Sequence, residues 1–194
     1  MKICIFGASS AHIDNIYIEK VEELGEKLAK RGHSLVFGAG GTGLMGASAR
    51  GAKRGGGYVF GVVPSFFKER GIEALYDDCD KVVYTETMRE RKAIMEDEAD
   101  AFIIVPGGVG TFEEFYEVVT LKQLNRHDKA IAILDIDGYY SELEKFMQVA
   151  CDRKFITESC LSLYQTFTDA DAVLDYIESY VPVSIPFART KLGD

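Results

Sequence analysis

The sequence AFIIVPGGVGTFEE, residues 101–114, joins an apolar strand to a helix through a glycine-rich turn. The apolar run at residues 102–105 is typical of a strand that is buried on both faces of a parallel sheet. Glycines in the turn remove side chains, so several backbone N–H groups can converge on one phosphate, to which Thr111 adds a hydroxyl. The turn lacks the lysine of a Walker A loop, which disfavours triphosphate hydrolysis and favours a monophosphate.

Short β-branched runs alternate with helical patterns along the rest of the chain, which is typical of βαβ units on a parallel sheet. We expect strands at residues 2–6, 35–37, 58–63, 81–84, 101–105 and 130–134. We expect helices at residues 13–31, 44–53, 88–98, 111–124, 139–151 and 170–179. The pattern predicts the α/β class: a single Rossmann-like, doubly wound, mainly parallel sheet with helices on both faces.

One domain is expected to span residues 1–180, because the chain of 194 residues suits a single core and shows no internal repeat or linker. Residues 181–194 contain Pro182 and Pro186 and show no periodicity. We therefore expect a C-terminal arm that is either a surface segment or partly disordered.

The composition excludes several classes of function. The formal net charge is −9, whereas a nucleic-acid partner needs a basic stripe, so no polynucleotide is expected. Every apolar run is far shorter than the roughly 18 residues that cross a bilayer, and the first residues do not resemble a signal peptide. We expect a cytoplasmic protein with no membrane partner. The four cysteines form no C-x-x-C pair, which indicates reduced, mostly structural thiols.

Two further glycine turns follow predicted strands, where a doubly wound sheet places its ligands. The turn GASS at residues 7–10 is small enough for a phosphate or sugar to approach Ser9, although any strand-to-helix turn favours such residues. Residues 38–46 contain G-x-G-x-x-G, but no carboxylate stands about 20 positions further on to hold the ribose of a dinucleotide. We therefore expect Gly41 and Gly43 to serve a smaller nucleotide or a sugar phosphate.

Glu114 has two interpretations. Thr111 and Glu114 have the spacing of a capping box, in which the glutamate only satisfies a helix N-terminus. On a helix that starts here, however, Glu114 shares a stripe with Val118 and Leu121 and faces inward. An inward carboxylate beside a phosphate-binding turn is also a candidate catalytic residue.

Residues 87–95 predict a second unusual helix, which begins with a capping box. Met88 and Arg91 fall on one stripe, so a guanidinium interrupts an apolar face. An unpaired buried arginine is costly, and Arg91 therefore either has a carboxylate or phosphate partner or extends to the surface. Lys92 alone would be ordinary solvated charge.

Three segments together carry a family resemblance: GGTGLMG at residues 40–46, the helix start at residues 88–95, and PGGVGTFEE at residues 106–114. From about residue 2 to residue 180, the sequence resembles the Lonely Guy family of cytokinin-activating phosphoribohydrolases. Many relatives have carried the label "lysine decarboxylase". No lysine here stands in a recognisable pyridoxal phosphate context, so nothing in the sequence favours that label.

The resemblance implies hydrolysis of the N-glycosidic bond of a nucleoside 5′-monophosphate, typically an N6-modified adenosine monophosphate or AMP itself, to free base and ribose 5-phosphate. Arg91 and Glu114 match the catalytic pair of the family. The family also uses an upstream carboxylate, for which Glu73 is the candidate and Glu69 the alternative. The positions that match substrate and phosphate contacts are Lys92, Gly108, Val109, Gly110, Thr111 and Thr120. The candidate set also includes Gly107, Met88, Ser9, Gly41 and Gly43.

Two positions depart from the family pattern, and both bear on base preference. Arg89 stands where histidine is common, and the first turn reads Gly-Ala-Ser-Ser where Gly-Ser-Ser is usual.

The residue types suit this chemistry. Cleavage of an N-glycoside builds oxocarbenium character on the ribose, and a fixed carboxylate such as Glu114 can stabilise that charge or orient the attacking water. His12, His33 and His127 are widely separated, so neither a metal nor another cofactor is expected. Two alternatives stay open: a non-catalytic nucleotide or molybdenum-cofactor carrier, and a broader nucleotide 5′-monophosphate nucleosidase. Members of the family form dimers, which implies a homodimer or a higher homo-oligomer here.

Overall fold

The structure is a computed structural model that describes residues 1–70 and 74–182. Seven strands form one sheet. They are β1 (Lys2–Phe6), β2 (Ser34–Phe37), β3 (Val59–Pro64), β4 (Lys81–Thr85), β5 (Ala101–Ile104), β6 (Ala130–Leu134) and β7 (Gln165–Phe167). The helices are α1 (Asn15–Lys30), α2 (Gly43–Arg54), α3 (Ser65–Arg70), α4 (Met88–Glu98), α5 (Val109–Gln123), α6 (Ser141–Asp152), α7 (Glu158–Leu161) and α8 (Ala170–Ser179).

The strands are parallel and lie in the order β4-β3-β2-β1-β5-β6-β7. The chain winds outward from β1 in one direction as far as β4 and then returns to β5 on the other side of β1. The reversal between β1 and β5 is the topological switch point, where a doubly wound sheet leaves a crevice at the carboxyl ends of its strands. The predicted doubly wound α/β fold is confirmed.

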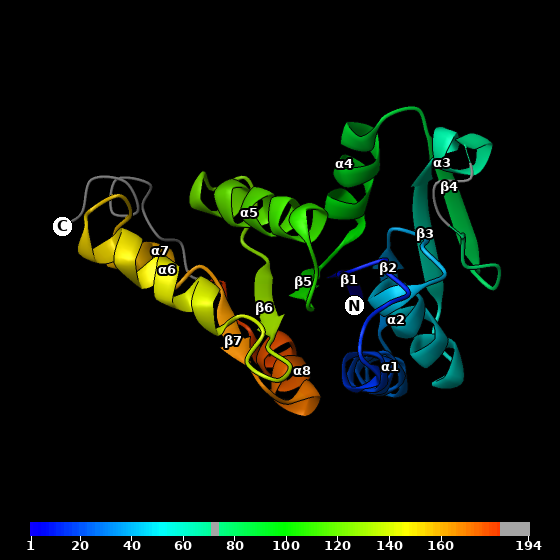
Figure 1. Cartoon of the computed structure of the whole chain (residues 1–194), viewed down its shortest axis with the longest axis horizontal. Helices are drawn as coiled ribbons and strands as arrows, with labels where there is room; N and C mark the ends of the chain where they lie inside the picture. The colour runs from blue at the N-terminus through cyan, green and yellow to red at the C-terminus, as the bar shows by residue number, and fades with distance from the viewer. Residues whose placement is uncertain (71–73, 183–194) are drawn as a thin grey trace.

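Helices cover both faces of the sheet, with α1, α2 and α8 on one side and α4 and α5 on the other (Figure 1). Alternate residues of β1 separate the two halves of the core, because successive side chains of a strand point to opposite faces. Ile3 and Ile5 pack with the α1, α2 and α8 side, whereas Cys4 and Phe6 pack with the α4 and α5 side. The central strands are therefore buried on both faces, as their apolar runs predict.

Three short elements were not expected from the sequence. Helix α3 follows Pro64 directly, α7 has four residues, and β7 has three. Elements this short end before an apolar period can repeat, so their patterns do not differ from those of loops. The other strands and helices agree with the expected ranges to within two residues at each end.

Three further expectations concern the cysteines, membrane-spanning helices and the C-terminal arm. The four cysteines are free thiols, as expected, and Cys4 and Cys160 are buried. In the described part of the chain, no helix has the length and apolar character needed to cross a bilayer. Helix α8 ends at Ser179, and the predicted C-terminal arm lies outside the described residues from residue 183 onward.

Candidate active site

The three glycine turns meet at the switch point, and backbone hydrogen bonds connect them. The N–H of Ala8, in the turn after β1, donates to the carbonyl of Pro106 in the turn after β5 (3.1 Å). The carbonyl of Ala8 accepts from the N–H of Leu44 (2.8 Å), at the start of α2, where the turn after β2 ends. Gly7 permits this approach, because a Cβ there would lie 2.3 Å from Cγ2 of Val105. The sequence thus places all three turns at one edge of the sheet.

A cavity of about 360 Å³ opens between these turns and helix α4. Its lining includes several of the predicted site residues, from three separate segments: Ser9, Met88, Arg91, Gly108, Gly110, Thr111 and Glu114. The lining residues that the sequence analysis did not single out as site residues are Gly7, Ala8, Ser10, Met45, Phe67 and Glu113. Apart from Glu113, these additional residues are small or apolar. The charged groups of the lining, Arg91, Glu113 and Glu114, therefore all come from α4 and α5.

Arg91 is buried and paired, so the surface interpretation of this residue is wrong. The residue is 5% exposed. Its Nε donates to the carbonyl of Val62 on β3 (3.1 Å), and its Nη1 donates to Oε1 of Glu114 on α5 (3.2 Å). The guanidinium therefore extends from α4 beneath the cavity and fixes the orientation of one carboxylate, which is the pairing that a buried arginine requires.

Glu114 faces the cavity and does not cap a helix, so the capping-box interpretation is wrong. Helix α5 begins two residues earlier than expected, with Gly108 as its N-cap, and this places Thr111 inside the first turn. The side chain of Glu114 is 11% exposed, against 54% for Glu113, which confirms the inward stripe. Burial raises the pKa of Glu114 to about 7, although the charge of Arg91 opposes this shift.

The first turn of α5 is open toward the cavity. A Cβ at Gly108 or Gly110 would meet no atom within 4 Å, so the loop leaves free space where a ligand can approach its backbone. The first N–H groups of a helix have no acceptor within it, and the positive end of the helix dipole attracts anions. Thr111, which is buried, lines the same surface. This end of α5 is therefore suited to a phosphate.

Gly41 and Gly43 of the second turn do not belong to the described cavity lining, and other loops approach them closely. A Cβ at Gly43, where φ is +58°, would lie 2.6 Å from the carbonyl oxygen of Ala8, and one at Gly41 would lie 2.9 Å from that of Leu75. Gly38 is in contact with Arg91, which the sequence did not reveal. The need for glycine at these positions arises from contacts with segments that are distant in the chain.

Lys92 is not solvated charge. Its ammonium forms ion pairs with Glu113 and with Glu117 (2.5 Å), and the residue is buried. Burial opposes the charged form, but the bonds to the two glutamates raise the pKa of Lys92. Lys92 therefore belongs to a charged cluster beside the cavity and is not part of its lining.

Two other predicted contacts, Val109 and Thr120, do not belong to the described cavity lining. Val109 is 84% exposed, and Thr120 is exposed on α5. Glu73 lies outside the described residues, as does the side chain of Glu69.

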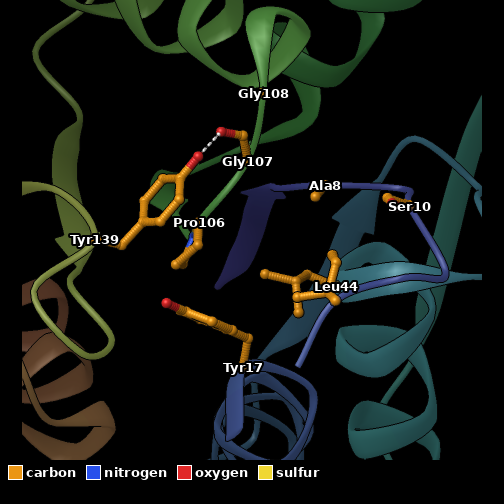
Figure 2. A pocket seen from close by; sticks show the side chains of 9 residues that line it. Ala8, Ser10, Tyr17, Leu44, Pro106, Gly107, Gly108 and Tyr139 are labelled. Atoms are coloured by element: carbon orange, nitrogen blue, oxygen red, sulfur yellow. Dashed lines mark hydrogen bonds between the residues drawn. The ribbon is translucent and has the colours of Figure 1, made fainter. Parts of the chain in front are cut away.

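A second cavity, of about 200 Å³, adjoins the first and shares Ala8, Ser10 and Gly108 with it (Figure 2). Its other walls include Tyr17 and Tyr139, whose rings meet edge to face at 6.2 Å. In Figure 2 the hydroxyl of Tyr139 extends to the carbonyl of Gly107, to which it donates at 2.5 Å. Gly107, one of the predicted site residues, therefore lines the second cavity and not the first.

The neighbouring Tyr140 also bonds to the main chain, at the point where β5 passes into the glycine turn. Its buried hydroxyl donates to the carbonyl of Val105 (2.8 Å). Two consecutive tyrosines from the loop after β6 thus fix the main chain on both sides of Pro106. Periodicity in the sequence gives no signal for such a contact.

Among the described residues, no cluster of three or more His, Cys, Asp or Glu side chains has the geometry of a metal site. The three histidines lie apart: His127 bonds to the carbonyl of Val118, and His33 pairs with Glu178.

Comparison with known proteins places the chain in a family. The model of a family described as "Possible lysine decarboxylase" matches residues 45–177. The chain is 35% identical over 193 residues to a cytokinin riboside 5′-monophosphate phosphoribohydrolase of Arabidopsis thaliana, which covers 100% of this chain and 90% of the relative. It is 38% identical over 182 residues to a probable enzyme of the same name in Oryza sativa subsp. japonica, covering 94% and 79%.

Solved structures share the fold at lower identity. The molybdenum cofactor carrier protein of Chlamydomonas reinhardtii has a TM-score of 0.69 at 23% identity, covering 91% of this chain and 96% of that one. The molybdenum cofactor binding protein of Rippkaea orientalis has a TM-score of 0.69 at 19% identity, covering 92% and 95%. At these identities the likeness shows the fold alone. The full-length match to the plant enzymes, together with the family model, shows that this chain belongs to the Lonely Guy family.

Proposed function

We propose that this protein hydrolyses the N-glycosidic bond of an adenosine 5′-monophosphate, with N6-modified forms as the preferred substrates, and releases the free base and ribose 5-phosphate. The observation that carries the proposal is the buried Arg91–Glu114 pair, which faces the open N-terminus of α5 across one cavity. The membership of the family and the names of its plant relatives support the same reaction.

The 5′-phosphate anchors the substrate in the site. It docks on the backbone N–H groups of residues 108–111 at the start of α5, with the Thr111 hydroxyl beside it. The helix dipole and several converging donors make this contact strong although the chain is acidic overall. Anchoring the phosphate fixes the ribose above the next turn of α5, where Glu114 lies, and so converts a diffusive encounter into a positioned one.

Glu114 acts on the ribose. As the C1′–N bond breaks, positive charge develops on C1′ and O4′, and the ionised carboxylate stabilises that charge and orients water toward C1′. The water oxygen bonds to C1′, one proton of the water is released, and the bonding electrons of the old bond leave with the base, which takes up a proton. Arg91 holds the carboxylate in place, because its two hydrogen bonds connect Glu114 to the carbonyl of Val62.

Base release tests the proposal. The purified protein is incubated with AMP and with N6-isopentenyladenosine 5′-monophosphate, and free base and ribose 5-phosphate are quantified by chromatography. We expect both products in equal amounts from the wild type, and their loss in Glu114→Ala and Arg91→Ala. Tight binding of the nucleotide with no release at excess protein would instead identify a carrier. Equal turnover of many purine and pyrimidine monophosphates would identify a broader nucleosidase.

We also propose that the protein acts as a cytoplasmic homodimer or higher homo-oligomer. Large apolar side chains stay exposed in the described chain, among them Phe146 on α6 and Phe155 just beyond it, which supports a self-contact. Light scattering after size-exclusion chromatography tests this, with at least twice the mass of the 21.5 kDa chain expected.

A further inference from the structure

Lys122 is a buried charge that the proposed reaction does not use. It lies in the last turn of α5, about 12 Å from Glu114 along the helix axis at 1.5 Å per residue. The residue is 7% exposed. Within residues 1–70 and 74–182, its ammonium forms no ion pair and no hydrogen bond. Nζ lies over the ring of Tyr180, 4.8 Å from its centroid.

A cavity of about 400 Å³ lies beside this ammonium. Its other walls come from the start of β7 and the end of α8, and they carry the Gln165 amide, the Ser179 hydroxyl and the rings of Tyr176 and Tyr180. No carboxylate belongs to the described lining. The cavity therefore combines one buried cation, neutral polar groups and an aromatic wall, and it shares no lining residue with the two cavities at the switch point.

An uncompensated ammonium at such a position is costly. Burial lowers the pKa of Lys122 to about 8, and the charge of Asp128, which is not paired with it, offsets only part of this. An anion in the cavity would offset the cost of burying the ammonium, because a buried charge is tolerated when it is paired. A single positive charge is balanced by a single negative charge, which favours a monocarboxylate over a phosphate dianion. The tyrosine rings suit an apolar or aromatic body on the same molecule.

We propose that this cavity is a binding site for a small organic monocarboxylate, with the carboxylate paired to Nζ of Lys122 and the apolar part against Tyr176 and Tyr180. The site is separate from the Arg91–Glu114 cavity, so it can be occupied together with a nucleotide.

Benzoate is the probe for this proposal, and Lys122→Met is the variant, because methionine keeps much of the length of the side chain and removes the charge. Titration calorimetry should show one saturable benzoate site per wild-type chain and at least tenfold weaker binding to Lys122→Met. Base release from AMP reports that the variant is folded. Equal affinity in both proteins, or no saturable binding to the wild type, would overturn the proposal.

A second measurement needs no variant. In protein labelled with ¹⁵N-lysine, saturating benzoate should raise the pKa of the Lys122 ammonium, because the bound carboxylate stabilises the charged form. An unchanged titration in the presence of bound benzoate would place the ligand elsewhere and reject the site. Inorganic phosphate should not displace benzoate, since its own site is at the other end of α5. Displacement would contradict the assignment to a monocarboxylate.

Discussion

Gly38 and Arg91 are in such close contact that a Cβ at position 38 would lie 1.7 Å from Nη2 of the arginine. Gly38 follows β2, whereas Arg91 projects from α4. The absence of a side chain after β2 gives the guanidinium the space it needs to contact β3 and Glu114. The first glycine of the G-x-G-x-x-G segment therefore makes room for the Arg91–Glu114 pair, although the segment resembles a nucleotide loop.

Gly38→Ala should slow base release strongly, although position 38 itself does not belong to the cavity lining. The new methyl group displaces the guanidinium, and a shift of this order in a positioned group costs roughly 100-fold in rate. Base release from AMP measures the effect. Gly32→Ala is the control: φ is +81° there and nothing lies within 4 Å, so it should cost about 1–2 kcal/mol of stability and leave the rate unchanged. Wild-type activity in Gly38→Ala would show that Arg91 does not need its present position.

Removal of either partner of the buried pair should slow turnover strongly, but the two variants should differ in stability. Arg91→Met leaves a buried carboxylate unpaired and should lower the free energy of unfolding by about 3–5 kcal/mol. Glu114→Gln keeps a hydrogen-bonding side chain and should destabilise less. Both should reduce base release by roughly 100-fold or more.

The double variant of this pair should be little slower than the single variants, because the two residues act as a unit. Glu113→Gln is the matched control, since Glu113 lines the same cavity but is half exposed. A loss in Glu113→Gln as large as that in Glu114→Gln would mean that the wrong carboxylate has been assigned to the reaction.

Tyr139→Phe should weaken phosphate binding more than it slows the chemical step. It removes the hydrogen bond to the Gly107 carbonyl and leaves the ring packing intact, so the phosphate-binding turn loses one restraint. We expect KM for AMP to rise several-fold with a smaller change in kcat. Tyr17 lines the same cavity but forms no hydrogen bond to the turn, so the control variant Tyr17→Phe should leave both constants unchanged. Equal effects of the two substitutions would assign the role to the cavity and not to the hydrogen bond.

The rate should fall as the pH is lowered through about 7. The pKa of Glu114 is raised by burial to about 7, so the protonated and inactive form persists to an unusually high pH for a carboxyl group. Below that value, kcat should decrease tenfold per pH unit. Measuring kcat at saturating AMP separates this effect from titration of the free substrate, whose phosphate has a pKa of about 6. A kcat that is flat between pH 5 and 8 would mean that Glu114 does not act as the ionised carboxylate.

The fold was predictable because it depends on local signals. Apolar runs of strand length, each followed by a glycine turn and an amphipathic helix, suffice to predict the doubly wound sheet. The helix start at Met88 was also local: Thr87 accepts a hydrogen bond from the N–H of Glu90, as expected. The carboxylate of Glu90 bonds to the N–H of Glu86 instead of Thr87, a detail that depends on the conformation of the preceding turn.

The site was only partly predictable because its remaining requirements are long-range. The inward stripe of α5 and the cost of an unpaired buried arginine were enough to select Glu114 and Arg91. The other contacts join segments at least 20 residues apart in the chain. They are the close approach of other loops to Gly41 and Gly43, the hydrogen bond from Tyr139 to Gly107, and the ion pairs of Lys92. A single sequence records no such contacts.

The crystal structure of Glu114→Gln bound to AMP is the most direct test of the account. This variant keeps the shape of the site and should not consume the ligand. We predict phosphate oxygens within hydrogen-bond distance of the backbone N–H groups of residues 108–111, with the ribose C1′ facing the side chain at position 114. A phosphate bound elsewhere, or this turn left empty at saturating AMP, would contradict the account.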